Sequence, residues 1–451
     1  MLLALGVFAF GLRLFVVEAV REPCLREAEA VEEGDCYQFG GDTQYVAVQA
    51  ERLVAGDGFV DATKVIYPVG DPTDPGAAHP PGFTLWLALL RLLGADSVAA
   101  WRAAMCALGG MSVVLVALAA GRLADRVGVQ PILASALAGV AAAVDPLLWS
   151  REVDLLVEGV TIPVTAAFIL VCLAYAERRT LRRAAIVGAV VGLAWLLRSE
   201  QIALLALIAP LFFAVPRSDA VPRSDMSVRR RFAHFAIAAA VAAAPMTAWI
   251  LRNWRAFGMP LVSNNGGTAL LLGACDGTFS GEDFGWYLWE CLDSAPTDPS
   301  GDEAANDRRR GRVALDYLKE NAGRVPWVVA ARVGRHWALY RVGHTIRSEA
   351  LLEWHGWTPT RLGVAALWLR LPFAVGGIAL CRKRRVPVSP LVAPVVVSTV
   401  AAALFIPLWR FRTPADVALL VSASVCVAAL IGRVMRRHPD MPKDESGVSP
   451  R

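Results

Sequence analysis

Long apolar runs recur along this 451-residue chain and constrain its fold more than any other feature. Hydrophobic residues make up 56% of the sequence, charged residues only 19%, and the mean hydropathy is +0.47. A run of about 20 apolar residues is long enough to cross a bilayer as a helix, so we expect an all-α, polytopic membrane protein of about ten transmembrane helices. The expected crossings at 131–144, 184–197 and 201–216 are short and should be tilted or broken helices. The crossings are expected at 2–20, 97–121, 131–144, 154–176, 184–197, 201–216, 232–251, 361–381, 386–408 and 415–432.

The first run, 2–20, lacks a basic start and a small-residue cleavage pattern. We therefore interpret it as a retained helix rather than a signal peptide. Residues 1–432 are expected to form a single membrane module. Residues 433–451 are expected to be a disordered cytoplasmic tail.

The basic residues gather in short clusters between the apolar runs. Positive charge favours the cytoplasmic side of a membrane, so we expect these clusters inside, and ten crossings then place both termini there. Because the net charge of +5 is spread over separate clusters rather than one patch, no nucleic-acid partner is expected. The clusters lie within 122–126, 178–183, 217–231, 382–385 and 433–437.

Two long segments, 21–96 and 252–360, face the outside in this topology. Long loops commonly carry function, and we expect the site in these segments. Short amphipathic helices are predicted at 308–321 and 327–341. The apolar run 83–93 is too short to cross and should lie on the membrane or the outer face.

Cysteines occur as pairs in both outer segments. Cys24 and Cys36 lie in the first segment, and Cys275 and Cys291 lie in the second. An oxidising compartment would permit a local disulfide in each segment. The sequence leaves open whether either bond forms.

Asp42 and His79 are the first candidates for chemistry, because both lie in the first outer segment. The carboxylate of Asp42 could act as a general base on an acceptor hydroxyl, or it could cap the helix that it opens. His79 precedes two prolines that hold the backbone extended. Its imidazole could donate a hydrogen bond to a phosphate, or it could be an ordinary surface side chain.

Charged residues near the expected helix ends form a second group of candidates. Glu158 lies about one turn inside a crossing, where a carboxylate needs protein or a wet cavity around it. Arginines at outer helix ends could bind a phosphate together, or they could only extend their charge to the water. Arg13 and Arg102 could pair with carboxylates purely to hold helices together. The outer arginines are Arg198, Arg252, Arg410 and Arg412.

The order and placement of these motifs resemble those of the GT-C glycosyltransferases over nearly the whole chain. The branch that it resembles most includes the bacterial protein O-mannosyltransferases, the aminoarabinose transferases of lipid A and the Rgt-type lipopolysaccharide sugar transferases. This resemblance implies a GT-C-like fold in a bacterial plasma (inner) membrane. It also implies sugar transfer in the cell envelope, outside the cytoplasm, from a polyprenyl-phosphate donor to a lipid, glycan or protein acceptor. The matching motifs are Gly41-Asp42, His79-Pro80-Pro81-Gly82, Ser150-Arg151 before Glu158, and Leu197-Arg198-Ser199-Glu200.

The resemblance also implies roles for individual residues. Asp42 corresponds to the catalytic base, Glu158 to a second catalytic carboxylate, and His79 to a position near the donor phosphate. Many relatives carry Asp-Glu in the first outer loop, whereas this chain has Asp42-Thr43, so a second loop carboxylate is missing there. The remaining expected substrate-binding residues are Arg198, Arg252, Asn265, Arg410 and Arg412.

Two other functions remain open at the sequence level. A glycan ligase or polymerase that uses a diphosphate-linked donor would need an arginine-rich pocket. A lipid or sugar transporter would be expected to show an internal repeat, and the two halves of the sequence show none. The sequence contains no phosphate-cradling glycine loop and no zinc-ligand motif. No cofactor is expected with certainty, the need for a divalent metal is left open, and neither the sugar nor the acceptor can be identified.

Overall fold

The computed structural model describes residues 1–21, 41–67, 70–213, 227–352 and 356–437. In these ranges the chain is built from helices without a strand, and an isolated bridge joins Val60 to Pro75. The predicted all-α fold is therefore confirmed. The cysteine pair in the first outer segment and the C-terminal tail beyond Arg437 lie outside the described residues.

Five helical spans are long and apolar enough to cross a membrane, and each coincides with an expected crossing. The fifth runs from Trp409 to Arg436 and combines η4 (Trp409–Arg412) with α21 (Thr413–Arg437). A multi-pass membrane protein is thus supported, while the count of ten crossings stays a prediction. The other four are α6 (Val98–Val127), α9 (Val157–Glu177), α13 (Val228–Phe257) and α19 (Trp357–Lys383).

Two further apolar helices, α7 (Pro131–Val144) and α8 (Pro146–Val153), meet at a bend of 56° and would form a sixth span if they cross the membrane together. Asp145 causes the break: its backbone leaves the helical conformation, and its side chain accepts a hydrogen bond from the Leu147 amide at 2.9 Å. Proline at the first position of α8 suits a new helix start, because its missing N–H would be unpaired there anyway. The short run at 131–144 therefore ends at a sharp bend, which fits either a broken span or a re-entrant pair of helices.

The remaining helices of the bundle are shorter. The expected crossing at 201–216 is broken into three short helices up to Phe213, and the segment that follows lies outside the described residues. These elements are α1 (Leu2–Phe15), η1 (Val16–Arg21), α10 (Leu181–Leu197), η2 (Ser199–Ile202), α11 (Ala203–Leu207), α12 (Ala209–Phe213) and α20 (Ser389–Leu404).

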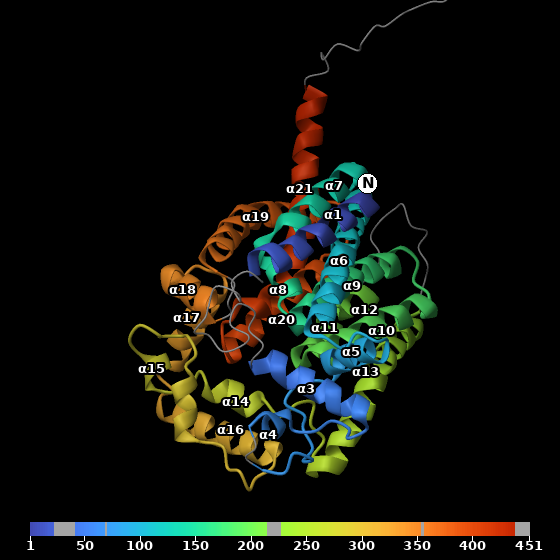
Figure 1. The fold of residues 1–451 in the computed structure, drawn as a ribbon. Coiled ribbons are helices and arrows are strands. Elements are labelled where there is room, and N and C mark those ends of the chain that lie inside the picture. The colour runs from blue at the N-terminus through green and yellow to red at the C-terminus, as the bar shows by residue number, and fades with distance from the viewer. Residues whose placement is uncertain (22–40, 68–69, 214–226, 353–355, 438–451) are drawn as a thin grey trace, which may run out of the picture.

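The outer segments form a layer of short helices at one end of the bundle (Figure 1). The N-terminal residue and the C-terminal end of α21 lie at the opposite end, as the expected topology requires (Figure 1). The layer is formed by α3 (Gly41–Ala55), α4 (Ala62–Ile66), α5 (Gly82–Leu92), α14 (Gly266–Leu271), α15 (Asp276–Phe279), η3 (Trp289–Ser294), α16 (Glu303–Glu320), α17 (Val325–His336) and α18 (Val342–Leu352).

The two predicted amphipathic helices are present as α16 and α17, with shifted ends. Helix α16 begins five residues earlier than predicted because Asp302 caps it, accepting a hydrogen bond from the Ala305 amide at 2.5 Å. Helix α17 ends five residues earlier, and positive φ angles of 53° at Ala338 and 46° at Arg341 follow its end. Such angles cannot continue a right-handed helix.

Helices α10 and α13 pack with their backbones in close contact. A Cβ atom at Gly188 would lie 2.2 Å from the carbonyl oxygen of Ala238, and one at Gly192 would lie 2.8 Å from that of Ala242. Only glycine permits this approach, as expected for a small-xxx-small pair between membrane helices. The packing fixes the position of the outer end of α10, where Arg198 follows the helix.

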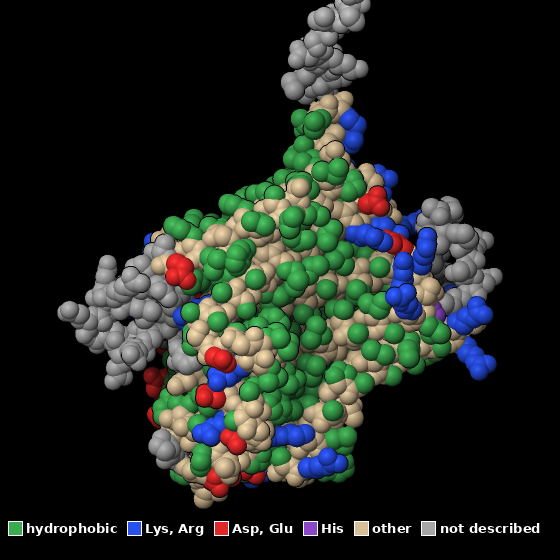
Figure 2. Space-filling model, turned by 45° about the vertical axis from the view of Figure 1, so that its right-hand side comes forward, with side chains coloured by type: hydrophobic (Ala, Val, Ile, Leu, Met, Phe, Trp, Pro, Cys, Tyr) green, Lys and Arg blue, Asp and Glu red, His purple; other side chains and the backbone are tan. Residues whose placement is uncertain are grey.

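Charged side chains inside the bundle are paired. Arg13 lies 2.5 Å from Glu152, and both side chains are 1% exposed. Arg370 pairs with Asp145 at the helix break. These pairs support the structural alternative for Arg13, because an isolated charge would be costly there. On the molecular surface, hydrophobic side chains cover the middle of one face and charged ones gather toward its edges, as expected for a protein surrounded by a bilayer (Figure 2).

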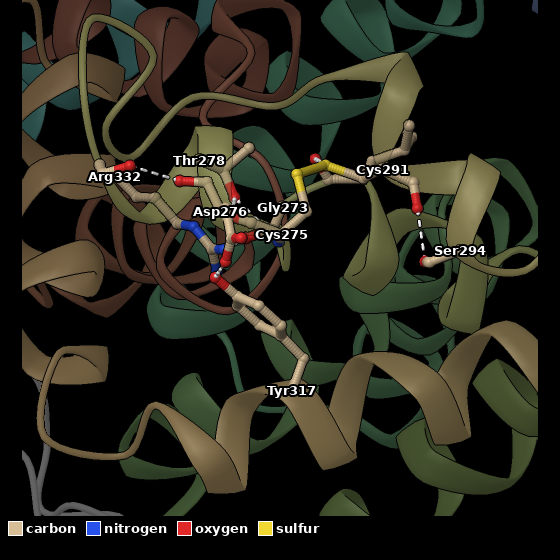
Figure 3. The surroundings of a disulfide bond; sticks show 10 residues. Gly273, Cys275, Asp276, Thr278, Cys291, Ser294, Tyr317 and Arg332 are labelled. Carbon is tan, nitrogen blue, oxygen red and sulfur yellow. Dashed lines mark hydrogen bonds between the residues drawn. A yellow bond between two sulfur atoms is a disulfide. The ribbon is translucent and has the colours of Figure 1, made fainter.

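Cys275 and Cys291 form a disulfide with a Cα–Cα distance of 5.5 Å (Figure 3). Residues next to the disulfide are also tied to α16 and α17. Tyr317 donates a hydrogen bond to Asp276 at 2.8 Å, and Arg332 donates one to the carbonyl oxygen of Gly273 at 2.6 Å (Figure 3). The disulfide therefore lies in a braced part of the second outer segment, on the same side as the first.

Candidate active site

Asp42 lies in the first turn of α3 and faces cationic groups from two other elements. Its Oδ2 atom is 2.9 Å from Nη2 of Arg410, and its Oδ1 atom is 3.5 Å from Nε2 of His79. The Asp42 side chain is 42% exposed, so solvent or a substrate can still reach it. The carboxylate is thus used in contacts beyond its own helix.

The charge balance keeps Asp42 ionised. Partial burial raises the pKa of Asp42, but Arg410, His79 and Arg198 lower it more strongly, and the net result is a pKa of about 2. At neutral pH the side chain is therefore a carboxylate. While Arg410 holds it, however, this carboxylate is a weak base.

His79 is held beside Asp42 by its local sequence. Pro80 and Pro81 follow it directly, and the edge of its ring packs against the ring of Tyr45 with centroids 5.5 Å apart. Burial lowers the pKa of His79, and although Asp42 opposes this effect, the pKa stays below its usual value. The imidazole is then mostly neutral at pH 7, and one ring nitrogen can still donate a hydrogen bond.

Arg198 and Glu158 form the inner side of the site. Arg198 lies 2.5 Å from Glu158 and 2.6 Å from Glu200, and its guanidinium stacks over the ring of Phe411 at 4.1 Å. Phe411 is the direct neighbour of Arg410. Glu158 is only 1% exposed, so its carboxylate reaches the site through Arg198.

The structure thus brings together five of the eight residues selected from the sequence. These residues come from segments far apart in the chain: α3, the loop before α5, the start of α9, the end of α10, and η4 before α21. Their convergence joins the outer layer to the outer ends of the bundle helices. The five residues are Asp42, His79, Glu158, Arg198 and Arg410.

The other three selected residues do not join this cluster through any contact within the described residues. Arg252 donates hydrogen bonds to the carbonyl oxygens of Gly76 and Phe59, so it braces the first outer segment. Arg412 is completely buried, pairs with Asp416 at 3.1 Å, and donates to the His336 carbonyl oxygen. Asn265 precedes α14. Both guanidinium groups thus already contact other parts of the protein, and the phosphate contacts expected for Arg252 and Arg412 stay predictions.

Glu303, at the start of α16, is a polar residue that the sequence did not indicate. Its carboxylate accepts hydrogen bonds from Tyr45, the Ala77 amide and Asn264, at 2.9, 2.5 and 3.2 Å. Only its place directly after the helix-capping Asp302 was visible in the sequence, and that pattern predicts a helix start rather than a long-range contact.

Metal ligands do not gather in this region. Among the described residues, no three His, Cys, Asp or Glu side chains come close enough together to hold a metal ion. Asp42 also already faces two cationic groups.

No protein-family model and no curated protein matches this chain. Among solved structures, it is similar to the oligosaccharyltransferase of Archaeoglobus fulgidus in the apo form, with 14% identity and a TM-score of 0.50 over 97% of this chain and 51% of that one. The same enzyme tethered to an acceptor peptide gives 15% identity and a TM-score of 0.48, with coverage of 97% and 50%. The oligosaccharyltransferase AglB of Archaeoglobus fulgidus, in complex with an inhibitory peptide and a dolichol-phosphate, gives 14% identity and a TM-score of 0.44, with coverage of 99% of this chain and 52% of that one.

The likeness to the apo enzyme supports a GT-C fold for the membrane bundle. At this level of identity it shows the fold alone. The chain spans about half the length of these archaeal proteins. A shared fold does not determine activity, substrates or partners, which depend on the residues of the candidate site.

Proposed function

We propose that this protein is a membrane glycosyltransferase that moves a sugar from a polyprenyl-phosphate donor to an acceptor hydroxyl outside the cytoplasm. One observation carries the proposal: an accessible carboxylate, Asp42, lies within 3.5 Å of two groups able to bind phosphate, Arg410 and His79. A base and an anion site side by side are what such a transfer needs.

The chemistry follows from this arrangement. The acceptor oxygen attacks the anomeric carbon of the sugar, and its proton passes to the Asp42 carboxylate. The bond between that carbon and the phosphate oxygen breaks, and the polyprenyl phosphate leaves with an additional negative charge. The Arg410 guanidinium and a ring N–H of His79 stabilise this charge.

Donor binding also makes Asp42 a better base. In the free protein Arg410 holds the pKa of Asp42 at about 2. A donor phosphate that pairs with Arg410 draws part of this positive charge away from the carboxylate. The pKa of Asp42 then rises at the moment when a proton has to be accepted.

Glu158 and Arg198 support the residues that contact the donor. Buried Glu158 fixes Arg198, and Arg198 packs on Phe411 beside Arg410. We therefore assign Glu158 to positioning the cationic side of the site rather than to proton transfer.

A diphosphate-linked donor is the second candidate. Two phosphates would need several available cations, yet the Arg198 guanidinium already contacts Glu158 and Glu200. This pairing favours a single phosphate. The location in a bacterial plasma membrane and a lipid, glycan or protein acceptor belong to the same proposal.

A donor panel tests the proposal. The purified protein is incubated with several polyprenyl-phosphate sugars and, separately, with diphosphate-linked sugars, and the released lipid phosphates are measured. We expect turnover of at least one monophosphate donor. Turnover of diphosphate-linked donors alone would contradict the proposal and favour the ligase.

A further inference from the structure

Glu303 joins the two outer segments directly behind the candidate active site. Its Oε1 atom accepts the hydrogen bond from the Tyr45 hydroxyl, and its Oε2 atom accepts those from the Ala77 amide and the Asn264 side chain. Tyr45 and Ala77 precede Glu303 by 258 and 226 residues in the sequence. One carboxylate thus connects α16 to α3, to the loop before His79, and to the start of the second outer segment.

Both contacts to the first outer segment lead to the candidate site. Tyr45 lies one helical turn after Asp42 on α3, and its ring packs against His79. Ala77 lies two residues before His79, and its carbonyl oxygen accepts a hydrogen bond from the backbone N–H of Asn264 at 2.7 Å. Movement of the Glu303 carboxylate would therefore move the two elements that carry Asp42 and His79.

The charge state of Glu303 determines whether these contacts persist. All three partners donate hydrogen bonds, so the ionised carboxylate satisfies them, whereas a protonated carboxyl group loses acceptor capacity. Burial and the nearby Asp61 raise the pKa of Glu303, the three hydrogen bonds lower it, and the pKa comes to about 7.

The surroundings of Glu303 contain other charged and titratable groups. Asp61 caps α4, and Lys64 on α4 pairs with Asp74 at 2.5 Å and donates to the Gly301 carbonyl oxygen. Arg252 on α13 contributes positive charge, and Tyr45 and His79 approach from the first outer segment. Loss of a proton from His79 as pH rises would weaken phosphate binding, whereas loss of a proton from Glu303 restores the link. The two groups therefore affect activity with opposite signs.

We propose that Glu303 is a positioning residue whose ionised carboxylate holds Tyr45 and the loop before His79 in the geometry that the donor-phosphate site requires, and that its protonation releases this link. This inference rests on the proposed transferase function. It adds a pH-sensitive connection between the second outer segment and the site.

Amide hydrogen exchange tests the link independently of activity. In Glu303→Gln an amide N–H₂ replaces one acceptor oxygen, so at pH 8 we expect the Ala77 amide to exchange about 10-fold faster than in the wild type. Glu320→Gln, at the exposed far end of the same helix, is the matched control and should leave this exchange unchanged. Equal exchange in the wild type and Glu303→Gln would overturn the link.

The pH profile of transfer tests the positioning role. We expect kcat/KM for the donor to rise with pH through an apparent pKa near 7 in the wild type, and this limb to be absent from Glu303→Gln. Asp61→Asn removes a charge that raises the pKa of Glu303 and should move the limb to lower pH. Tyr45→Phe removes a hydrogen bond that lowers this pKa and should move the limb to higher pH.

Opposite shifts in these two variants cannot arise from general destabilisation. A limb that stays in place in both variants would overturn the positioning role. If no polyprenyl-phosphate sugar is turned over but exchange at Ala77 still depends on Glu303, the proposed function fails while the structural link stands.

Discussion

Arg410 is the residue on which the charge balance of the candidate site depends. Its guanidinium contacts Asp42 at 2.9 Å, and its own side chain is only 15% exposed. Arg410→Gln should weaken binding of polyprenyl phosphate by about 10- to 100-fold, because a hydrogen bond to a charged group contributes about 1.5–3 kcal/mol. Binding is measured by titration of the purified protein. Arg255→Gln, at an exposed position of α13, is the control and should bind normally.

Equal affinities in the Arg410 and Arg255 variants would show that the phosphate binds elsewhere. Arg410→Lys is an informative intermediate. It keeps the charge but loses the planar pair of donors, so we expect affinity between those of the wild type and Arg410→Gln.

The raised pKa of Glu303 also predicts that the stability of the protein depends on pH. Its pKa is raised from 4.5 to about 7, so the stability that it contributes is fully present below pH 4.5 and is lost as pH rises through about 7. Glu303→Gln does not titrate. Its thermal midpoint, measured by tryptophan fluorescence, should therefore rise relative to that of the wild type between pH 5 and pH 8.

A difference in midpoint that stays constant over this pH range would contradict the raised pKa. Near neutral pH the native protein keeps Glu303 partly ionised, although burial opposes this ionisation. Such opposition to stability is common where function needs a particular charge state.

At the scale of elements, the packing of α10 on α13 controls the position of Arg198. Gly188→Ala places a methyl group against a backbone carbonyl oxygen that cannot move aside, so we expect a loss of about 1–3 kcal/mol in stability and reduced transfer. Gly11→Ala is the control, because a Cβ atom there meets nothing within 4 Å. Thermal unfolding of both variants provides the comparison. A Gly188→Ala variant as stable as Gly11→Ala would show that the two helices are not in close contact.

The sequence predicted elements well where a local signal exists. The long apolar runs, the short broken run before Asp145 and the amphipathic helices α16 and α17 all follow from periodicity and composition. Helix ends were missed where they depend on a cap such as Asp302 or on positive φ angles such as that of Ala338. It was harder to predict which side chains from distant segments meet at the candidate site. Arg410 and Arg412 look alike in the sequence, yet only the structure shows that one faces Asp42 and the other is buried against Asp416.

At the scale of the whole molecule, the site requires both outer segments to lie on one side of the membrane. Glu303 links them directly, and the layer of short helices that they form lies at one end of the bundle (Figure 1). In a variant without other unpaired cysteines, a cysteine at exposed Thr63 or Ser300 should react with a membrane-impermeant thiol reagent in intact cells. One at Ser227 should be protected.

Labelling at Ser227 together with protection at Thr63 would invert the topology and remove the extracytoplasmic transferase from consideration. Protection at only one of Thr63 and Ser300 would separate the two outer segments and contradict the site itself. The basic clusters and the disulfide in the second segment both favour the proposed orientation.

The most direct test of the central claim measures turnover and donor binding in the same Asp42→Asn protein. Asparagine keeps the shape of the side chain but cannot accept the proton, so transfer should fall by about 100-fold or more. Affinity for polyprenyl phosphate should be unchanged or higher, because a negative charge beside the phosphate has been removed. Near-normal turnover in Asp42→Asn would contradict the assignment of Asp42 as the base.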